Sequence, residues 1–210
     1  MSGPPPPIAS PGGSRRLCRG DTPQPPGSRR EAILAAALEL FRRRGFHSVG
    51  IDEIGTLAGI SGPGVYRHFP SKSSLLVALF DSLSERMLVA AEEIQKVDCP
   101  PEEALDRLVG FHVTTAVAER DLLAVWLQDA QSLPRSDQER IARRQVEYIA
   151  VWEATLARLR PELGPAEAQT VVHAALGAIN SIAFHDPGVP PEALEALLGD
   201  AARAVLGEST

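Results

Sequence analysis

Cysteine, aromatic residues and long apolar runs are all scarce in this sequence. Only two cysteines occur among 210 residues: Cys18 lies in a proline-rich segment and Cys99 directly before two prolines. Two thiols cannot build a disulfide framework, so we expect both to be unpaired, as in a reducing cytoplasm. Aromatic residues make up 5% of the chain. Alanine and leucine are plentiful and runs of β-branched residues are rare, which favours helices over strands.

No apolar stretch approaches the roughly 18 residues that a membrane-spanning helix needs. The basic residues near the N-terminus are not followed by the apolar segment of a secretory signal. Both observations predict a soluble, cytoplasmic protein with no membrane partner.

The sequence also lacks the usual patterns of an enzyme. His112, His173 and His185 have no partner at a metal-ligand spacing such as His-x-x-x-His. There is neither a glycine-rich phosphate loop nor a nucleophile elbow. We therefore predict that the protein is not an enzyme and that it has no catalytic residues, no metal site and no cofactor.

The net charge of −6 conceals two unlike regions. Residues 28–80 carry seven basic and four acidic side chains, whereas residues 81–210 carry 11 basic and 22 acidic ones. A basic front on an acidic body indicates that only the front meets a polyanion. A solvated basic surface with no partner is the alternative.

Residues 1–27 hold eight prolines among scattered glycine, serine and arginine. This composition cannot bury enough apolar surface to fold, so we predict a disordered tail. An arginine arm that reaches into a DNA groove is a second interpretation of the same segment.

From residue 28 onward the apolar spacing is helical, and prolines or glycines mark the breaks. Ser28 and Glu31 have the spacing of a capping box, and Gly45 would end the helix that they open. The other expected helices cover residues 51–58, 61–69, 71–97, 101–118, 119–132, 136–160, 165–185 and 190–207. The prediction is an all-α fold.

Residues 46–70 predict a helix, a tight glycine turn and a short second helix, which is the helix-turn-helix arrangement. Ser61 and Pro63 would start the short helix, and Pro70 would stop it. One or two helical turns are enough to reach base edges in a major groove. Gly62 and Gly64 leave little side chain at the tip, so the backbone could approach DNA closely.

The segment GIDEIGTLAGISGPGVYRHFPSKSSLL, residues 50–76, resembles the DNA-binding domain of the tetracycline-repressor (TetR) family of bacterial transcription regulators. The preceding segment LELFRRRGF is also similar to that family. The matching positions extend over three consecutive helices: Ile51, Ile54, Ala58, Gly59, Ile60, Ser61, Tyr66, Phe69, Lys72, Leu75 and Leu76. Beyond about residue 80 the chain resembles the family only in its length and helical character.

The resemblance implies three regions. They are a disordered tail at 1–27, a three-helix helix-turn-helix DNA-binding domain at 28–75, and a larger helical effector-binding and dimerisation domain at 76–208. The resemblance further implies a homodimer that binds a palindromic operator in double-stranded DNA. It would act as a repressor that leaves the operator when a small-molecule effector binds.

The family pattern implies a DNA-binding set formed by Gly62, Pro63, Gly64, Tyr66, Arg67, His68 and Lys72. Tyr66 and Lys72 would contact phosphates, which position the protein without reading sequence. Arg67 is the one strong candidate for reading a base, because guanidinium groups suit guanine O6 and N7. Packing of Tyr66 and His68 in the core is the alternative.

The sequence departs from the family pattern at two positions. Gly50 stands where a threonine is common, which puts one phosphate contact in doubt, although glycine can still cap a helix. Gly62 stands where a lysine or similar residue is common, which removes one cation. An interaction protein that uses a helix-turn-helix scaffold without binding DNA is therefore a second hypothesis.

The middle helices hold most of the remaining aromatic residues together with a few polar ones, as a small-molecule cavity between helices requires. The candidate set is Phe111, His112, Trp126, Trp152, His173, Asn180 and Phe184. Each could instead be an ordinary core residue. The segment WLQDAQSLP, residues 126–134, resembles actinobacterial family members that sense acyl-CoA thioesters. A small, largely apolar effector is predicted, with a fatty acyl or acyl-CoA compound as one hypothesis.

Residues 165–185 and 190–207 are rich in alanine and leucine. Small residues let helices approach closely, so two such helices from each subunit could form a four-helix bundle between two copies. Packing within one chain is the alternative, and the family resemblance favours the bundle.

Overall fold

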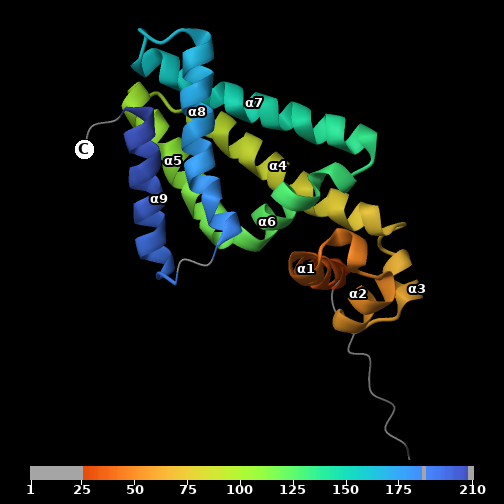
Figure 1. Ribbon diagram of the computed structural model, residues 1–210. Coiled ribbons are helices and arrows are strands. Elements are labelled where there is room, and N and C mark those ends of the chain that lie inside the picture. Colours follow the sequence, from red (N-terminus) through yellow and green to blue (C-terminus); the bar gives the residue numbers. More distant parts are fainter. Residues whose placement is uncertain (1–25, 186–187, 208–210) are drawn as a thin grey trace, which may run out of the picture.

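The structure is a computed structural model that describes residues 26–185 and 188–207, and every regular element in these ranges is helical (Figure 1). The α-helices are α1 Pro26–Arg44, α2 Ile51–Leu57, α3 Gly62–Tyr66, α4 Lys72–Lys96, α5 Pro101–Ala118, α6 Arg120–Asp129, α7 Arg135–Leu159, α8 Pro165–Asn180 and α9 Pro191–Leu206. Three short 3-10 turns are η1 Phe46–Ser48, η2 Ala130–Ser132 and η3 Ser181–Phe184. The predicted all-α fold is confirmed.

Among the helix limits that differ from the prediction, those of α1 and α8 have a clear physical reason. α1 begins at Pro26 instead of after Ser28, because proline has no N–H to lose in the first turn of a helix. α8 ends at Asn180, and the expected last turn is the 3-10 turn η3. The Ser181 hydroxyl donates to the carbonyl of Ala178 at 2.7 Å, a local bond that competes with the α-helical ladder. Cys18 and residues 1–25 of the predicted tail lie outside the described residues.

The helices α1, α2 and α3 form a small bundle at one end of the molecule (red to orange in Figure 1). Its core is apolar and closed: Ile33, Phe41, Ile54 and Val65 have no exposed surface, and Phe69 is 2% exposed. Val65 and Phe69 are thus core residues. The short α3 is therefore held from behind by its own apolar side chains.

The helix α4 runs from this bundle into the rest of the molecule without a break. It crosses the predicted boundary between residues 75 and 76. The first core also takes in Leu122 and Val125 of α6 and Ile141 of α7. The three-helix end thus packs directly on α6, and the exact limits of the two domains stay a prediction.

A second apolar core lies between α5, α7, α8 and α9. Leu105, Trp152, Leu156, Ile179 and Leu206 are fully buried there. The helices α8 and α9 lie side by side along one edge of the molecule (Figure 1). The side chains of this core leave a cavity toward α4 and α6.

Candidate DNA-binding surface and effector cavity

The turn between α2 and α3 is tight because glycine occupies its critical positions. Gly59 adopts φ 72°, a left-handed conformation that favours glycine. A β-carbon at Gly55 would lie 3.0–3.1 Å from the backbone of the following turn. One at Gly62 would overlap the carboxylate of Asp52. Gly62 is thus buried against α2, and its place at the DNA groove stays a prediction.

The helix α3 starts as its sequence predicts. The Ser61 hydroxyl accepts a hydrogen bond from the Gly64 N–H at 3.3 Å, and Pro63 lies in the first turn. Gly64 is partly buried, close to the side chain of Ile60. The cap and the buried Val65 fix the direction of a helix that has only five residues.

Four of the predicted DNA-binding side chains form the outer surface of this element: Pro63, Tyr66, Arg67 and His68 are all exposed. Tyr66 is 54% exposed. Neither Tyr66 nor His68 is therefore a core aromatic residue, and that alternative is excluded. The surface offers a hydroxyl, a guanidinium and an imidazole next to one another, on an element with a rigid apolar support.

Lys72 has a different environment from the one expected. Its Nζ atom donates to the carbonyl oxygens of Phe46 at 2.7 Å, His47 at 3.3 Å and Val49 at 2.9 Å. It also lies 4.5 Å from the centre of the Phe46 ring. The three donors of the ammonium group are thus directed at the backbone of η1 and of Val49, which follows it. Lys72 fixes η1 onto the start of α4, and its contact with a DNA phosphate stays a prediction.

Gly50 caps α2 with its backbone only. Its N–H donates to the Glu53 carboxylate at 2.9 Å, and Arg44 donates to the same carboxylate at 2.6 Å. These two contacts, the Gly50 N–H first, hold the pKa of Glu53 below its usual value. Helix capping therefore survives without the usual threonine, but no hydroxyl is available here for a phosphate.

The end of α6 and the following turn η2 are bound to η1 by contacts that the sequence did not predict. The carboxylate of Asp129, 6% exposed, accepts a hydrogen bond from the Phe46 N–H at 3.2 Å. In addition, the Ser132 hydroxyl lies 3.0 Å from Nε2 of His47. Partners 83 and 85 positions apart leave no local pattern in a single sequence. These contacts join the three-helix end to the helix that borders the cavity.

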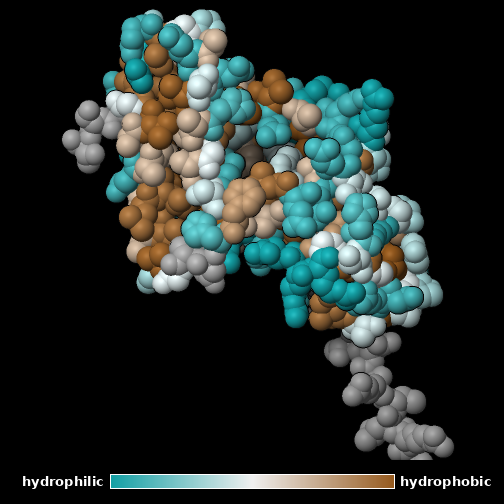
Figure 2. Space-filling view, viewed as in Figure 1, coloured by the Kyte–Doolittle hydropathy of each residue, from teal (hydrophilic) through white to brown (hydrophobic). Residues whose placement is uncertain are grey.

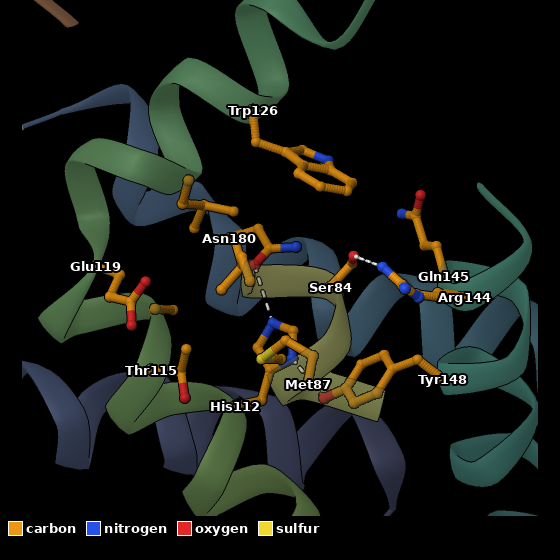
Figure 3. A pocket seen from close by; sticks show the side chains of 13 residues that line it. Ser84, Met87, His112, Thr115, Glu119, Trp126, Arg144, Gln145, Tyr148 and Asn180 are labelled. Atoms are coloured by element: carbon orange, nitrogen blue, oxygen red, sulfur yellow. Dashed lines mark hydrogen bonds between the residues drawn. The ribbon is translucent and has the colours of Figure 1, made fainter. Parts of the chain in front are cut away.

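The cavity lies between α4, α5, α6, α7 and α8 (Figure 3). The volume of the cavity is about 100 Å³, and about 650 Å³ when the open space at its mouth is included. Its apolar wall includes Leu83, Met87, Leu123 and Trp126. The cavity is partly open and the surface of its lining is mainly apolar, as is usual for a small-molecule site.

A chain of hydrogen bonds crosses the floor of the cavity. Nδ1 of His112 lies 2.7 Å from the Tyr148 hydroxyl, and Nε2 lies 3.0 Å from Oδ1 of Asn180 (Figure 3). Burial lowers the pKa of His112 to about 4, and the bond to Asn180 opposes this shift. Burial also raises the pKa of Tyr148, with Trp152 acting in the opposite direction. Both groups are therefore uncharged near neutral pH.

Charged side chains at the edge of the cavity are paired. Arg86 and Glu119 form an ion pair at 2.6 Å, and this bond raises the pKa of Arg86. Arg144 contacts Asp81 at 2.7 Å and lies 3.4 Å from the Ser84 hydroxyl. Arg140 also pairs with Asp81. The lining thus carries charges of both signs, and each has a counter-ion.

The predicted cavity set is only partly brought together. His112, Trp126 and Asn180 line the cavity, and Trp152 is buried behind it with its ring edge-on to His112. Phe111, His173 and Phe184 do not line it: Phe111 faces an outer hollow between α4 and α5, His173 is exposed on α8, and Phe184 is 77% exposed. Phe111 lies directly before His112 on the same helix, and successive side chains of a helix point in different directions, so Phe111 faces away from the cavity. Tyr148 was absent from the predicted set, although it lies one helical turn before Trp152.

The described residues contain no group of three or more His, Cys, Asp and Glu side chains that could hold a metal ion. None of the described helices is both long and apolar enough to span a membrane. Cys99 is a free thiol.

Comparison with known proteins matches both ends of the molecule. Residues 33–79 match the profile of bacterial regulatory proteins of the tetR family, and residues 98–202 match the tetracyclin repressor-like C-terminal domain. The chain therefore belongs to the TetR family of bacterial transcriptional regulators, and homologues in this family are regulators and not enzymes.

Two curated relatives come from Mycolicibacterium smegmatis. The transcriptional activator FasR is 46% identical over 68 residues, 32% of this chain and 29% of FasR. The transcriptional regulator EthR is 33% identical over 109 residues, 48% of this chain and 50% of EthR. The chain thus matches half or less of the length of these relatives.

Solved structures share the fold over most of the chain. A TetR-family regulator from Bordetella parapertussis has a TM-score of 0.76 with 22% identity, over 84% of this chain and 93% of that one. AibR, solved with isovaleryl coenzyme A and operator DNA, has a TM-score of 0.69 with 19% identity, over 82% and 97% of the two chains.

Proposed function

We propose that the protein is a dimeric, ligand-responsive transcriptional regulator that reads duplex DNA with α3. The observation that carries the proposal is the outer surface of α3, where polar side chains are exposed on an element anchored by Val65 and Phe69. A short helix with a rigid apolar back and a polar front can enter a major groove without a change of fold. As a regulator of bacterial genes it would act in the cytoplasm.

Each exposed residue of this surface has a role that fits its chemistry. Tyr66 would donate its hydroxyl to a phosphate, and Lys72 would add a cation near the same strand. Arg67 would read guanine through O6 and N7, with His68 beside it. Pro63 and Gly64 would flank the groove, and Gly62 would contribute by letting α2 and α3 pack closely.

The dimer is proposed from the exposed face of α8 and α9. Figure 2 shows apolar residues gathered over α9 and along its border with α8. Leu197 is 58% and Val205 38% exposed on α9, with small residues such as Ala174 and Gly177 exposed on α8. An apolar face with small side chains suits a four-helix bundle of two copies. Two copies would place two α3 surfaces on a palindromic operator.

The effector is proposed to be a small, largely apolar molecule that enters the cavity and releases the protein from DNA. The contacts of Asp129 and Ser132 with η1 support this, because α6 borders the cavity through Leu123 and Trp126. A fatty acyl or acyl-CoA compound is compatible with the apolar wall. AibR has the same fold and was solved with an acyl-CoA, so the fold can hold such a compound.

The polarity of regulation is proposed as repression. FasR, the most similar relative in percentage identity among those described above, is named a transcriptional activator, so activation is the second candidate. Footprinting of DNA upstream of the protein's own gene, with and without a bound cavity ligand, separates the two. Loss of protection on ligand addition supports repression, and stronger protection contradicts it.

The test of DNA reading is selection of preferred duplexes from a random library by the wild-type protein and by Arg67→Ala. We expect the wild type to select a palindrome, and Arg67→Ala to lose about 1–3 kcal/mol and relax its preference at one position of each half-site. Arg143→Ala, an exposed arginine on α7 far along the chain, serves as the matched control. A wild type that selects no duplex would favour the interaction-protein hypothesis.

A further inference from the structure

The hydrogen-bond chain on the cavity floor has a direction, and this direction determines what the cavity offers to a ligand. Oδ1 of Asn180 can only accept, so Nε2 of His112 must carry the proton that joins them. A neutral imidazole then has a bare Nδ1, which accepts from the Tyr148 hydroxyl. The single hydroxyl proton of Tyr148 is thereby used.

The hydrogen-bond chain ends at Asn180, and it does not use the amide nitrogen of this residue, which is a donor. Nδ2 of Asn180 carries two N–H bonds. In Figure 3 it points away from His112, into the space bounded by Trp126 and Ser84. Because His112 is buried and uncharged, the chain holds the Asn180 amide in one orientation without bringing a charge into the cavity. The cavity therefore contains a fixed, neutral donor within apolar walls.

No cation of the lining is left without a counter-ion. Arg144 is the only lysine or arginine among the residues that line the cavity in the described part of the chain, and Asp81 holds it at 2.7 Å. On the opposite side Glu119 is paired with Arg86 at 2.6 Å. Moving a carboxylate or phosphate from water into such a site has a large desolvation cost, because no unpaired charge offsets it.

We propose that the cavity selects an uncharged, mainly apolar molecule that places one carbonyl oxygen, such as that of an ester, amide, ketone or thioester, on the Asn180 amide N–H. Asn180 is the specificity-determining residue, and His112 with Tyr148 are the positioning residues that aim it. The inference rests on the proposed function, since it names the class of effector for the same cavity. A free neutral molecule and an acyl-CoA share this chemistry, the second with its charged part held outside the mouth.

Tryptophan fluorescence provides the measurement. The chain has only two tryptophans: Trp126 lines the cavity, and Trp152 packs against His112. The full-length protein is titrated at pH 7 with a medium-chain methyl ester, the carboxylate of the same length, the primary alcohol and the alkane. We expect the ester to bind roughly five- to tenfold more tightly than the alkane, the gain from one hydrogen bond. The carboxylate should bind at least about tenfold more weakly than the ester.

Variants assign the selectivity to Asn180. Asn180→Leu should bind alkane and ester equally, and Asn180→Asp should lose the ester preference with little change of shape. Gln145→Leu, on the exposed rim of the cavity, is the matched control and should keep the wild-type ratio. Tyr148→Phe should lower the ester-to-alkane ratio while it leaves alkane affinity unchanged.

A final titration distinguishes the two compounds that could supply the carbonyl group, an acyl-CoA and a free neutral molecule. An acyl-CoA that binds more tightly than the truncated thioester with the same acyl group identifies the larger compound as the natural class. Equal or weaker binding identifies a free neutral molecule. Both results support the carbonyl assignment.

The carbonyl inference and the proposed effector cavity are contradicted by different results. Carboxylate binding as tight as ester binding, or alcohol binding tighter than ester binding, contradicts the inference and leaves an effector site in the cavity. Failure of every compound to change the fluorescence, in a protein that binds its operator, contradicts the effector cavity itself and so the proposed function.

Discussion

The two candidate sites of this molecule treat polar groups in opposite ways. At α3 the polar side chains point outward, and the apolar ones, Val65 and Phe69, are buried behind them. In the cavity the polar groups of His112, Tyr148 and Asn180 are bonded to one another within apolar walls. An exposed surface that keeps its hydroxyl and guanidinium in water can bind a highly charged polymer. A mainly apolar cavity with paired charges suits a neutral molecule.

The helix α6 is the element that belongs to both regions. Leu122 and Val125 lie in the core of the DNA-binding end, whereas Leu123 and Trp126 line the cavity. One turn further, Asp129 binds the backbone of η1. A single helix therefore connects the space where a ligand would bind to the segment that Lys72 holds.

The largest expected effect is on the cavity side. Trp152→Ala removes a fully buried indole from the second core. We expect the free energy of unfolding to fall by about 3–5 kcal/mol, because the void cannot collapse completely. Urea denaturation measures it. Cavity ligands should lose affinity together with this stability, whereas a loss below about 1 kcal/mol would contradict the packing described for Trp152.

The next effect depends on pH and on His112. Its pKa is about 4 in the folded protein and 6.5 ordinarily, so between these values the unfolded chain takes up the proton more readily. The contribution of His112 to the free energy of unfolding is therefore fully present above pH 6.5, and it is lost as the pH falls toward 4. Because of this residue, the free energy of unfolding should fall by about 2 kcal/mol between pH 7 and pH 4.5. Denaturant unfolding at both values should give a flatter pH dependence for His112→Gln, and an unchanged dependence would count against a buried neutral imidazole.

A change at Asp129 tests the connection between the regions. Asp129→Ala leaves the buried Phe46 N–H without its partner, so we expect a loss of roughly 1–3 kcal/mol in stability. DNA affinity should fall, while affinity for a cavity ligand in the absence of DNA should be kept. Ser132→Ala, which removes only the more exposed contact with His47, is the control and should cost less than about 0.5 kcal/mol. Equal effects of the two variants would argue against a special role for Asp129.

The smallest effects distinguish Tyr66 from Lys72. Tyr66→Phe should weaken DNA binding by about 0.5–1.5 kcal/mol for all sequences alike, with no loss of stability, because the hydroxyl is exposed. Lys72→Ala should lower stability as well, since it removes three bonds to η1. If Lys72 also neutralises a phosphate, the slope of log affinity against log salt changes by about one. An unchanged slope assigns Lys72 to η1 alone.

Local patterns were enough to predict the glycine turn before α3 and the start of α3. Ser61, Pro63 and Gly59 act on residues a few positions away, so their effects are visible in the sequence. The burial of Gly62 against Asp52 and the bonds of Lys72 were not predicted, because they depend on how neighbouring helices pack.

The cavity was harder to predict for the same reason. Its hydrogen-bond chain joins residues 36 and 68 positions apart, and composition alone cannot say which aromatic residue faces inward. Phe111 and His112 are neighbours in the sequence but point to different sides of α5. Phe184 lies beyond the end of α8 and outside the cavity. Tyr148 and Trp152 share one face of α7, a spacing that signals a common environment without identifying it.

Nuclease footprinting of the wild-type protein on DNA upstream of its own gene tests the central claim most directly, with the mass of the complex measured in parallel. The account predicts two protected half-sites related by two-fold symmetry, about one helical turn apart, occupied by two copies of the chain. Protection of a single half-site by one copy, or no protection of any duplex, would contradict it.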